Sequence, residues 1–439
     1  MRAADRYVDL RSAPGRSEGF DSRLPGTIAT TSNGSAQLPI MSTAQALGVT
    51  RLANITGLDR IGIPTYSAIV PRSDDSISVY TGKGLRPIDA KVGALMEAIE
   101  RQVILRTRLP IVEGSYRQLR LSCSIVNPGS LNECLRADYS ETNTYSWVSG
   151  TDLVSGEQVL VPAKLAGYIW ADIPHQSCFA VSTTNGVASG NCREEAICHA
   201  LCELIERDSW SLAELGAHFL PCARRAFASG SFCEGGFDDF EMFPVLELND
   251  EPLLDLFHRA GLYPVLHDIT SDLSIPTVFA AVPDNCLPGF PMVHCGLGTH
   301  PDARVAARRA LTEAAQSRCV DIQGIREDIV PPDSAATAFN VHTRRVSAID
   351  PHAWFLGKST NVRSREELPS AIHDDICLDI EHIVSRLVCC SLDQVVVVDF
   401  STSDDIFAVV RVIVPGLESW AIGRGRVGRR ALEFWRTHA

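Results

Sequence analysis

Two nearly identical pentapeptides constrain the fold of this chain more than any other feature. Glu-Ala-Ile-Glu-Arg occupies residues 97–101, and Glu-Leu-Ile-Glu-Arg occupies residues 203–207. Each copy follows a stretch that contains glycine and lies in a segment with the apolar spacing of a helix. Carboxylates three residues apart share one helix face, and the arginine four residues after the first glutamate joins them. A fold that brings both faces together gathers four carboxylates and two guanidinium groups, which suits a polyphosphate–Mg²⁺ site better than a structural helix.

A third segment, residues 302–322, carries a comparable polar face. Its Arg309, Glu313 and Gln316 are spaced four and three residues apart, which places them on one side of an Ala-rich helix preceded by Gly-Leu-Gly. A single Glu–Arg pair at this spacing is a common surface salt bridge worth about 0.2–0.5 kcal/mol. Three such helices, each expected to be entered from a Gly-containing loop, instead favour carboxylates that converge at the edge of a buried site.

The second of these helices is predicted over residues 192–214. Asn191 and Glu194 have the spacing of a capping box, which leaves Glu195 free to join the site. The small residues at 184–191 are expected to form a loop, and a loop that leads into a helix N-terminus can bind an anion.

The chemistry of a nucleotide site explains why such side chains would gather. Mg²⁺ prefers hard oxygen ligands and commonly lies between carboxylates and substrate phosphates. Neighbouring glutamates repel one another unless cations neutralise them, and basic side chains stabilise a triphosphate. Lys83, in a Gly-Lys-Gly segment, is a candidate phosphate contact, with a solvated loop lysine as the alternative. The segment is not a Walker A loop. His199, His294 and His300 are better explained by packing than as bases, and no nucleophile triad stands out.

The rest of the pattern alternates strands and helices, which is typical of mixed α/β or α+β folds. Strands are expected at 66–70, 76–80, 147–152, 158–162, 179–183, 395–400 and 407–414, a further helix at 87–106, alternating helix and strand at 245–290, and loop-like chain at 331–360. Residues 1–50 are expected to form an irregular arm with one strand, and residues 51–439 one catalytic domain.

The composition excludes several classes of protein. With 45% hydrophobic and 21% charged residues, the chain has the make-up of a globular protein with a large core. A net charge of −13 disfavours nucleic-acid binding. The sequence has neither an apolar run long enough to span a membrane nor a signal peptide, so we expect a cytoplasmic location. The 14 cysteines form no C-x-x-C pair and are expected to be buried thiols, with a zinc site from distant cysteines as the alternative.

The motifs together resemble the YcaO-domain family. They follow the family's order over residues 55–320: Thr-Gly-Leu-Asp at 56–59 with Gly-Ile-Pro at 62–64, Gly-Lys-Gly at 82–84, the first pentapeptide, Asn-Gly at 185–186, Gly-Asn at 190–191, Glu-Glu-Ala at 194–196, the second pentapeptide with Asp208, and Leu-Thr-Glu-Ala-Ala-Gln-Ser-Arg at 311–318. Each motif is modest alone, and their combination is specific. The family's S-x-x-x-E-x-x-E-R motif has a serine where this chain has Gly93, which removes one hydroxyl contact.

The resemblance implies ATP and Mg²⁺ as cofactors. The ATP contacts that it implies are Lys83, Glu97, Arg101, Asn191, Glu206, Arg207, Gln316 and Arg318, and the Mg²⁺ ligands are Glu97, Glu100, Glu195, Glu203, Glu206 and Glu313. It assigns no catalytic base or nucleophile to this chain.

The resemblance also implies the reaction and its partners. Such enzymes phosphorylate a backbone amide oxygen of a peptide, after which sulfide gives a thioamide or a neighbouring Cys, Ser or Thr gives an azoline. Val-Pro-Gly-Leu-Glu at 414–418 and the lack of a P-x-P-x-P ending resemble the subgroup that works with a TfuA-like protein, which implies thioamidation with an external sulfur donor. Homodimers are common in the family. A non-catalytic subunit that docks a ribosomal precursor peptide is the alternative of another class.

Overall fold

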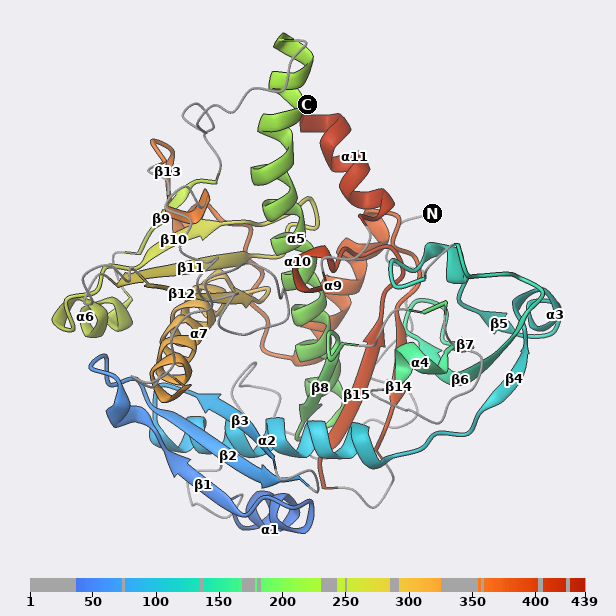
Figure 1. The fold of residues 1–439 in the computed structure, drawn as a ribbon, viewed down its shortest axis with the longest axis horizontal. Helices are drawn as coiled ribbons and strands as arrows, with labels where there is room; N and C mark the ends of the chain where they lie inside the picture. Colours follow the sequence, from blue (N-terminus) through green and yellow to red (C-terminus); the bar gives the residue numbers. More distant parts are fainter. Residues whose placement is uncertain are drawn as a thin grey trace.

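In the computed structural model, the structure describes residues 37–72, 76–134, 137–167, 178–179, 183–229, 243–248, 251–284, 292–324, 354–356, 359–401, 406–423 and 427–438. Within these residues the strands form three sheets, and the long helix α5 (Arg193–Ser229) passes through the centre of the molecule (Figure 1). The mixed α/β fold class is therefore confirmed. Among the described residues, no helix combines the length and the apolar character needed to cross a membrane.

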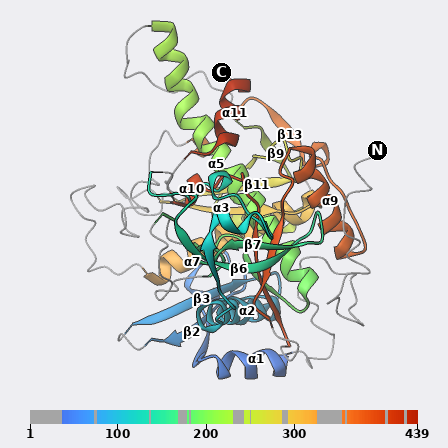
Figure 2. The same cartoon turned by 90° about the vertical axis from the view of Figure 1, so that its right-hand side faces the viewer.

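The first sheet has the order β1-β2-β3 and is covered by α2, against which α1 packs. Its strands are β1 (Arg51–Asn54), β2 (Thr65–Pro71) and β3 (Ile77–Lys83), and its helices are α1 (Gln37–Ala46) and α2 (Pro87–Arg106). Figures 1 and 2 both show this unit at the end of the molecule opposite the C-terminal helix. Helix α2 has the bounds that the sequence predicts, because Pro87 fits the first turn and the Asp89 carboxylate accepts a hydrogen bond from the Arg86 backbone.

Two expectations for this region are wrong. Residues 37–46 form a helix, where an irregular arm with one strand was expected; residues 1–36 lie outside the described part. The Gly-Lys-Gly segment is not a loop, because Gly82 and Lys83 end strand β3. Gly82 lies so close to α2 that a Cβ atom there would be 2.1 Å from the backbone nitrogen of Ala94. The glycine marks close packing between a strand and a helix rather than a turn.

The second sheet has the order β12-β11-β10-β9-β13, with α7 packed against β11 and β12. Its elements are β9 (Val245–Glu247), α6 (Pro252–Arg259), β10 (Val265–Asp268), β11 (Thr277–Asp284), β12 (Met292–Thr299), α7 (Ala303–Gly324) and β13 (Val362–Ser364). The predicted helix at 302–322 is confirmed. The Gly-Leu-Gly segment before it belongs to β12, because Gly296 and Gly298 let α7 approach the strand closely; a Cβ at Gly296 would lie 2.2 Å from the Ala314 nitrogen.

The third sheet has seven strands in the order β5-β7-β6-β14-β15-β8, with β4 paired to β6. Its strands are β4 (Val112–Ser115), β5 (Ser124–Ile125), β6 (Thr144–Asp152), β7 (Gln158–Pro162), β8 (Val187–Gly190), β14 (Val396–Asp399) and β15 (Ala408–Ile413). The predicted β6–β7 hairpin and the two C-terminal strands are confirmed. The expected loop at 184–191 is wrong for its second half, because Val187–Gly190 pairs with β15 as β8.

The remaining helices are short or lie toward the C-terminus: α3 (Tyr116–Leu119), α4 (Ala163–Ala166), α9 (Ile376–Cys389), α10 (Trp420–Gly423) and α11 (Arg429–His438). Helix α9 packs with α5 and the third sheet around a large apolar core. Most of the strand expected at 179–183 and of the loop expected at 331–360 lies outside the described residues, although Phe179 forms an isolated β-bridge with Cys134 and residues 354–356 form a short 3-10 turn.

Candidate active site

The fold brings the two repeated pentapeptides together. Glu97 and Glu100 of α2 lie close enough to Glu203 of α5 for the charge of Glu203 to raise the pKa of both. Each pentapeptide arginine lies beside both glutamates of its own copy. Arg101 is 3.7 Å from Glu97 and 3.5 Å from Glu100, and the contacts of Arg207 with Glu203 and Glu206 are 3.8 and 3.6 Å. The predicted convergence of α2 and α5 is therefore observed.

The third helix joins the same cluster from the opposite sheet. The Lys83 Nζ atom at the end of β3 donates to Oε2 of Glu313 on α7 over 2.5 Å. One turn further along α7, the Gln316 side-chain amide donates to the Thr81 backbone carbonyl over 2.6 Å. Glu206 interacts electrostatically with both Glu313 and Lys83. We refer to Glu97, Glu100, Glu203, Glu206 and Glu313 as the carboxylate cluster.

Backbone amides hold two members of the cluster in position. The Thr81 N–H donates to Glu97 over 3.1 Å, and the Gly186 N–H donates to Glu203 over 3.2 Å. Gly186 has a φ of +78°, and a Cβ atom there would lie 2.5 Å from the Val412 carbonyl oxygen, so this donor requires glycine. The Asn-Gly at 185–186 therefore serves to orient a carboxylate.

The side chains of the carboxylate cluster are only partly buried. Its side chains keep from 11% of their surface exposed for Glu206 to 36% for Glu97. Burial and the neighbouring carboxylates nevertheless raise the pKa of Glu100 to about 8, although Arg101 opposes the rise. The same causes raise the pKa of Glu206 to about 7, against the opposing charge of Arg207. Burial raises the pKa of Glu313 too, but Lys83 and Arg207 outweigh burial and leave this pKa below its usual value.

These shifts and the all-oxygen donor set fit a cluster that binds cations. Carboxylates that repel one another when they are ionised gain stability when a divalent cation lies between them. Within the described residues, no group of three His, Cys, Asp or Glu side chains is arranged to hold a metal ion by itself. Mg²⁺ is commonly bound by one or two carboxylates together with substrate phosphates. The arrangement therefore fits Mg²⁺ that arrives with a polyphosphate, with Lys83, Arg101 and Arg207 as its cationic neighbours.

Glu195 lies at the start of α5, two helical turns from Glu203, and it forms the helix cap. Its carboxylate accepts hydrogen bonds from the Asn191 backbone N–H and side-chain amide, each over 2.8 Å. The prediction that Glu194 caps this helix and leaves Glu195 free is therefore wrong, because the helix begins two residues after Asn191. Burial raises the pKa of Glu195, while Asn191 and Arg309 oppose the rise. Glu195 and Asn191 thus form a second group, centred near Arg309.

Two buried histidines share the neighbourhood of Arg309. Burial, with the charge of Arg309, lowers the pKa of His199 to about 3 and that of His300 to about 3. Imidazoles with such pKa values stay neutral near pH 7 and are weak bases. The expectation that neither histidine acts as a general base agrees with this environment.

Arg318 lies apart from the carboxylate cluster. Its Nε donates to Asp59 over 2.9 Å, and its Nη1 forms an ion pair with Asp284. The guanidinium is buried and holds the Thr-Gly-Leu-Asp segment of the family resemblance against α7. None of its described contacts reaches the cluster, so its role in ATP binding remains a prediction.

One buried cation beside the cluster was missed by the sequence reasoning. Arg411 of β15 donates to the Thr183 carbonyl over 2.7 Å, and its Nε is buried with no partner in the described part of the chain. Burial lowers its pKa to about 10, with Glu203 opposing the decrease and Arg101 adding to it. A single charged residue inside the apolar stretch 407–414 was the signal that could have identified it.

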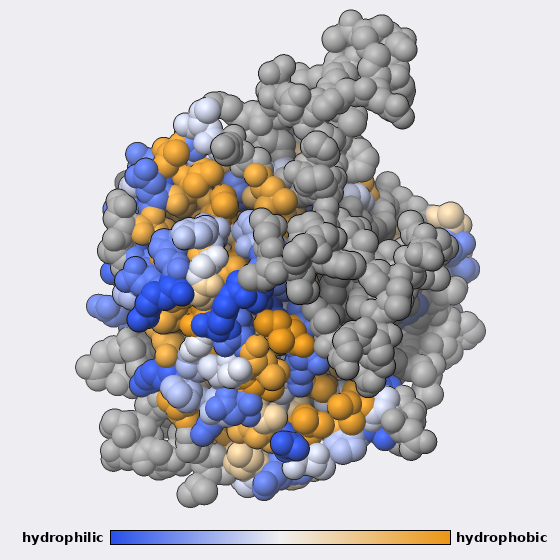
Figure 3. Space-filling model, turned by 60° about the vertical axis from the view of Figure 1, so that its left-hand side comes forward, coloured by the Kyte–Doolittle hydropathy of each residue, from blue (hydrophilic) through white to orange (hydrophobic). Residues whose placement is uncertain are grey.

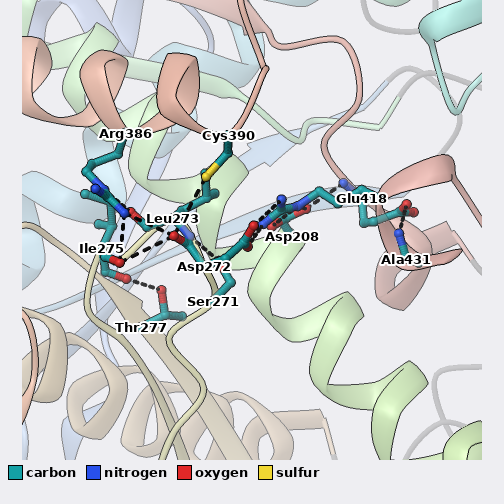
Figure 4. Close-up of polar contacts among 12 residues, drawn as sticks. Asp208, Ser271, Asp272, Leu273, Ile275, Thr277, Arg386, Cys390, Glu418 and Ala431 are labelled. Atoms are coloured by element: carbon teal, nitrogen blue, oxygen red, sulfur yellow. Dashed lines mark hydrogen bonds and ion pairs between the residues drawn. The ribbon is translucent and has the colours of Figure 1, made fainter. Parts of the chain in front are cut away.

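The segment Val-Pro-Gly-Leu-Glu at 414–418 is tied to the residue that follows the second pentapeptide. The Glu418 N–H donates to the Asp208 carboxylate over 2.9 Å, and the Glu418 carboxylate accepts from the Gly428 and Ala431 amides, each over 3.0 Å. Asp208, which lies beside Glu418 (Figure 4), also pairs with Arg430 over 2.8 Å. The segment thus fastens α11 to the helix that carries Glu203 and Glu206.

Comparison with known proteins identifies the family. A family described as YcaO cyclodehydratase, with ATP and Mg²⁺ binding, matches residues 81–418. The chain belongs to the YcaO family. The matched range contains every member of the carboxylate cluster as well as Lys83, Arg411 and Glu418.

Two relatives of this YcaO protein are similar over most of their length. An uncharacterized protein of Methanothermobacter thermautotrophicus is 37% identical over 88% of this chain and 93% of its own. A protein of Rhizobium leguminosarum bv. trifolii, described as lying in the tfuA 3′ region, is 31% identical over 84% of each chain.

Solved YcaO structures share the fold. The YcaO protein of Methanopyrus kandleri, bound with AMPPCP and Mg²⁺, superposes with a TM-score of 0.65 at 24% identity, over 90% of this chain and 92% of its own. A heterocyclase in complex with substrate and cofactor gives a TM-score of 0.67 at 20% identity over 95% of this chain and 55% of its own.

Proposed function

We propose that this YcaO protein uses Mg²⁺–ATP to phosphorylate a backbone amide oxygen of a peptide or protein, and that sulfur then replaces this oxygen to give a thioamide. The observation that carries the proposal is the carboxylate cluster, in which five glutamates from α2, α5 and α7 meet Lys83, Arg101 and Arg207. Residues 51–439 would form one catalytic domain.

The residues divide by charge into two roles. The carboxylate cluster would hold Mg²⁺, which supplies charge neutralisation between the phosphates. Lys83, Arg101 and Arg207 would contact the phosphates directly, and their charges would offset the negative charge that develops in the transition state. Gln316 would hold the β3 end in place through Thr81.

A second set would extend the nucleotide site along α5. Glu195, placed by Asn191, would contribute a further Mg²⁺ ligand from the group near Arg309. Arg318 would act near the phosphates only if its pairs with Asp59 and Asp284 rearrange.

The proposed reaction balances in two steps. The amide oxygen attacks the terminal phosphorus of ATP, and ADP leaves. Hydrosulfide then adds to the activated carbon; when the C–O bond breaks, the oxygen leaves as part of phosphate, a proton is released, and C=S remains. Amide oxygen is a poor leaving group and phosphate a good one, so this route explains why a peptide-modifying site would need ATP.

Two observations favour thioamide formation with a TfuA-like partner. The Rhizobium relative is described by its place in a tfuA 3′ region. The Val-Pro-Gly-Leu-Glu segment, which resembles the TfuA-associated subgroup, is anchored to Asp208 beside the second pentapeptide. The TfuA-like protein would deliver sulfur from sulfide or a sulfur donor, and the YcaO chain would act as a homodimer in the cytoplasm.

Azoline formation is the second candidate, favoured by the family's description as cyclodehydratases and by the heterocyclase fold match. A Cys, Ser or Thr side chain of the substrate would then attack in place of sulfide. Intact mass of a co-expressed substrate separates the two products, because a thioamide raises the mass and an azoline lowers it by one water.

The site is tested by replacing Glu203 with Gln and measuring Mg²⁺–ATP binding by calorimetry and ATP turnover with peptide, partner and sulfide. We expect both to fall by about tenfold or more, because a ligand charge is lost from the cluster. Glu141→Gln is the matched control, since this glutamate is 52% exposed and pairs only loosely with Arg120. Unchanged binding and turnover in Glu203→Gln would contradict the site assignment.

A further inference from the structure

In the described part of the chain, no strand pairs with one of the two edges of β3. Strand β3 is the last strand of the β1-β2-β3 sheet. The backbone N–H and C=O groups of its even-numbered residues point toward β2, and the hydrogen bonds Arg72–Ser76 and Gly84–Pro64 continue this pattern at both ends. In an antiparallel ladder the alternate residues point their N–H and C=O groups away from the partner strand. Thr81 confirms this geometry, because its N–H and C=O bond to side chains outside the sheet.

Ile77 and Val79 present the open part of this edge. Like Thr81 they are odd-numbered residues of the strand, so their backbone N–H and C=O groups also point away from β2. In the described part of the chain these groups form no hydrogen bond. Their side chains are 60% and 40% exposed. Apolar and polar surface alternate at this end of the molecule (Figure 3).

Natural proteins commonly protect such an edge with a charge, a proline or a bulge. Residues 77–80 read Ile-Ser-Val-Tyr and contain none of these. β-branched side chains at Ile77 and Val79 instead favour pairing with a further strand. An open edge of this composition is the surface that recognises an extended peptide by strand addition.

The edge continues into the carboxylate cluster. Two residues beyond Val79, Thr81 is bonded to Glu97 and Gln316, and Lys83 contacts Glu313. Each strand residue advances about 3.3 Å, so a peptide paired with Ile77 and Val79 would reach the cluster within a few residues. Because Glu97 and Gln316 occupy the edge at Thr81, that peptide must leave the ladder there. Its next amide oxygen would then be free of a strand hydrogen bond.

We infer that the free edge of β3 at Ile77–Val79 binds the substrate peptide as an added strand and directs the following amide into the carboxylate cluster. This inference rests on the proposed function for the identity of the ligand as a peptide. The peptide's backbone supplies the affinity, and the exposed Ile77 and Val79 side chains would favour apolar β-branched residues upstream of the modified amide.

The test uses the full chain and a fluorescein-labelled octapeptide of alternating Thr and Val as the probe. Anisotropy should show saturable binding to the wild type. Val79→Pro should weaken it by about tenfold or more, because proline removes the outward N–H and is tolerated where that N–H faces solvent. Val79→Thr, which keeps the N–H and the β-branched shape, should bind the probe nearly as the wild type does. The octapeptide with every backbone amide N-methylated should not bind.

Two controls separate the outcomes. Tyr263→Thr removes a similarly exposed side chain from the segment between α6 and β10, outside the first sheet, and should not change probe binding. Hydrogen exchange should show the Ile77 and Val79 amides unprotected without the peptide and protected with it. Equal binding of the probe by wild type and Val79→Pro, absence of binding to the wild type at millimolar peptide, or amides already protected without peptide would each overturn the inference.

Calorimetry with Mg²⁺–ATP on wild type and Glu203→Gln tests the proposed function independently, because the probe experiment contains no nucleotide. If the glutamate variant binds Mg²⁺–ATP normally while the edge still binds the peptide, the proposed nucleotide site is wrong and the peptide edge stands. If Glu203→Gln loses Mg²⁺–ATP binding but the edge does not bind the probe, the nucleotide site stands and the peptide edge is wrong.

Discussion

Lys83 and Glu313 lie 230 residues apart in the sequence, and their charged atoms meet at 2.5 Å. Lys83 ends the first sheet and Glu313 lies in the helix that covers the second, so this ion pair joins two sheets across the site. It also sets the charge balance, since Lys83 is a main reason why the pKa of Glu313 lies below its usual value while those of the other cluster members lie above theirs. The Lys83 ammonium therefore favours the ionised form of Glu313.

Replacing Lys83 with Met should raise the pKa of Glu313 and weaken Mg²⁺–ATP binding. Charge-assisted hydrogen bonds contribute about 1.5–3 kcal/mol, so we expect a loss of about 10- to 100-fold in affinity. Calorimetry gives the affinity, and Lys83→Arg is the control that keeps the charge. Equal affinities for Met and Arg variants would show that the lysine charge is not used.

Two glycines that face each other across the β3–α2 contact should respond in opposite ways to alanine. A Cβ at Gly82 would lie 2.1 Å from the Ala94 nitrogen and 2.2 Å from the Ala90 oxygen, both backbone atoms, whereas at Gly93 the nearest atom is 3.4 Å away. Gly82→Ala should destabilise the protein by about 1–3 kcal/mol or more. Gly93→Ala should stabilise it by about 0.5–1 kcal/mol, since it replaces a helical glycine. Urea unfolding measures both, and a stable Gly82→Ala variant would contradict the packing described here.

The position of Gly93 also bears on its departure from the family's serine. A Cβ there would lie 3.8 Å from the Lys83 backbone nitrogen and oxygen. A serine would therefore fit beside the end of β3 without a clash.

The helices and the cluster could be predicted from sequence because their signals are local. Helix α2 begins and ends where Pro87 and the apolar spacing predict. In each pentapeptide, five consecutive residues are enough to identify the polar face of the helix. Their convergence was expected because three similar faces on an otherwise apolar background have few other uses.

The errors arose where tertiary contacts decide the conformation. The Gly-rich stretches at Gly82, Gly296 and 187–190 suggested loops, but in each the small residues lie in strands that a helix approaches closely. The role of Arg411 depends on a strand pairing far along the chain. The helix begins at residue 193, one residue later than expected, and this shift makes Glu195 rather than Glu194 the capping residue. Local propensity does not fix a helix start to within one residue.

The C-terminal anchor provides a stability prediction with an internal control. Arg430 pairs with Asp208, which is fully buried, and also with Asp272. Arg430→Gln should cost about 3–5 kcal/mol, because it leaves a buried carboxylate without its cation. Its neighbour Arg429 is 90% exposed in its pair with Glu433, so Arg429→Gln should change stability by at most about 0.5 kcal/mol. Chemical unfolding monitored by far-UV dichroism compares them, and similar losses would refute the anchor.

Glu100 predicts how the stability of the metal-free protein depends on pH. Burial and neighbouring charges raise its pKa from 4.5 to about 8, so the folded state binds this proton more tightly than the unfolded state. Stability should therefore fall as the pH rises from the lower to the higher of these values. One pKa unit corresponds to about 1.4 kcal/mol, so the full rise of this pKa from 4.5 to about 8 corresponds to a loss of about 5 kcal/mol. Urea unfolding across this range measures it, and Glu100→Gln should flatten the profile; an unchanged profile would exclude Glu100 as its cause.

Binding of Mg²⁺–ATP should release protons from the carboxylate cluster. Near pH 7, Glu206 with a pKa of about 7 and Glu100 with a pKa of about 8 are partly protonated, and a cation between the carboxylates favours their ionised forms. Affinity should therefore rise with pH until both groups are ionised in the free protein. Calorimetry in buffers of different ionisation enthalpy measures the protons released, and Glu206→Gln should release fewer than the wild type, whereas Glu141→Gln should release as many. Uptake of protons, or release that Glu206→Gln leaves unchanged, would mean that the cluster is not where the cation binds.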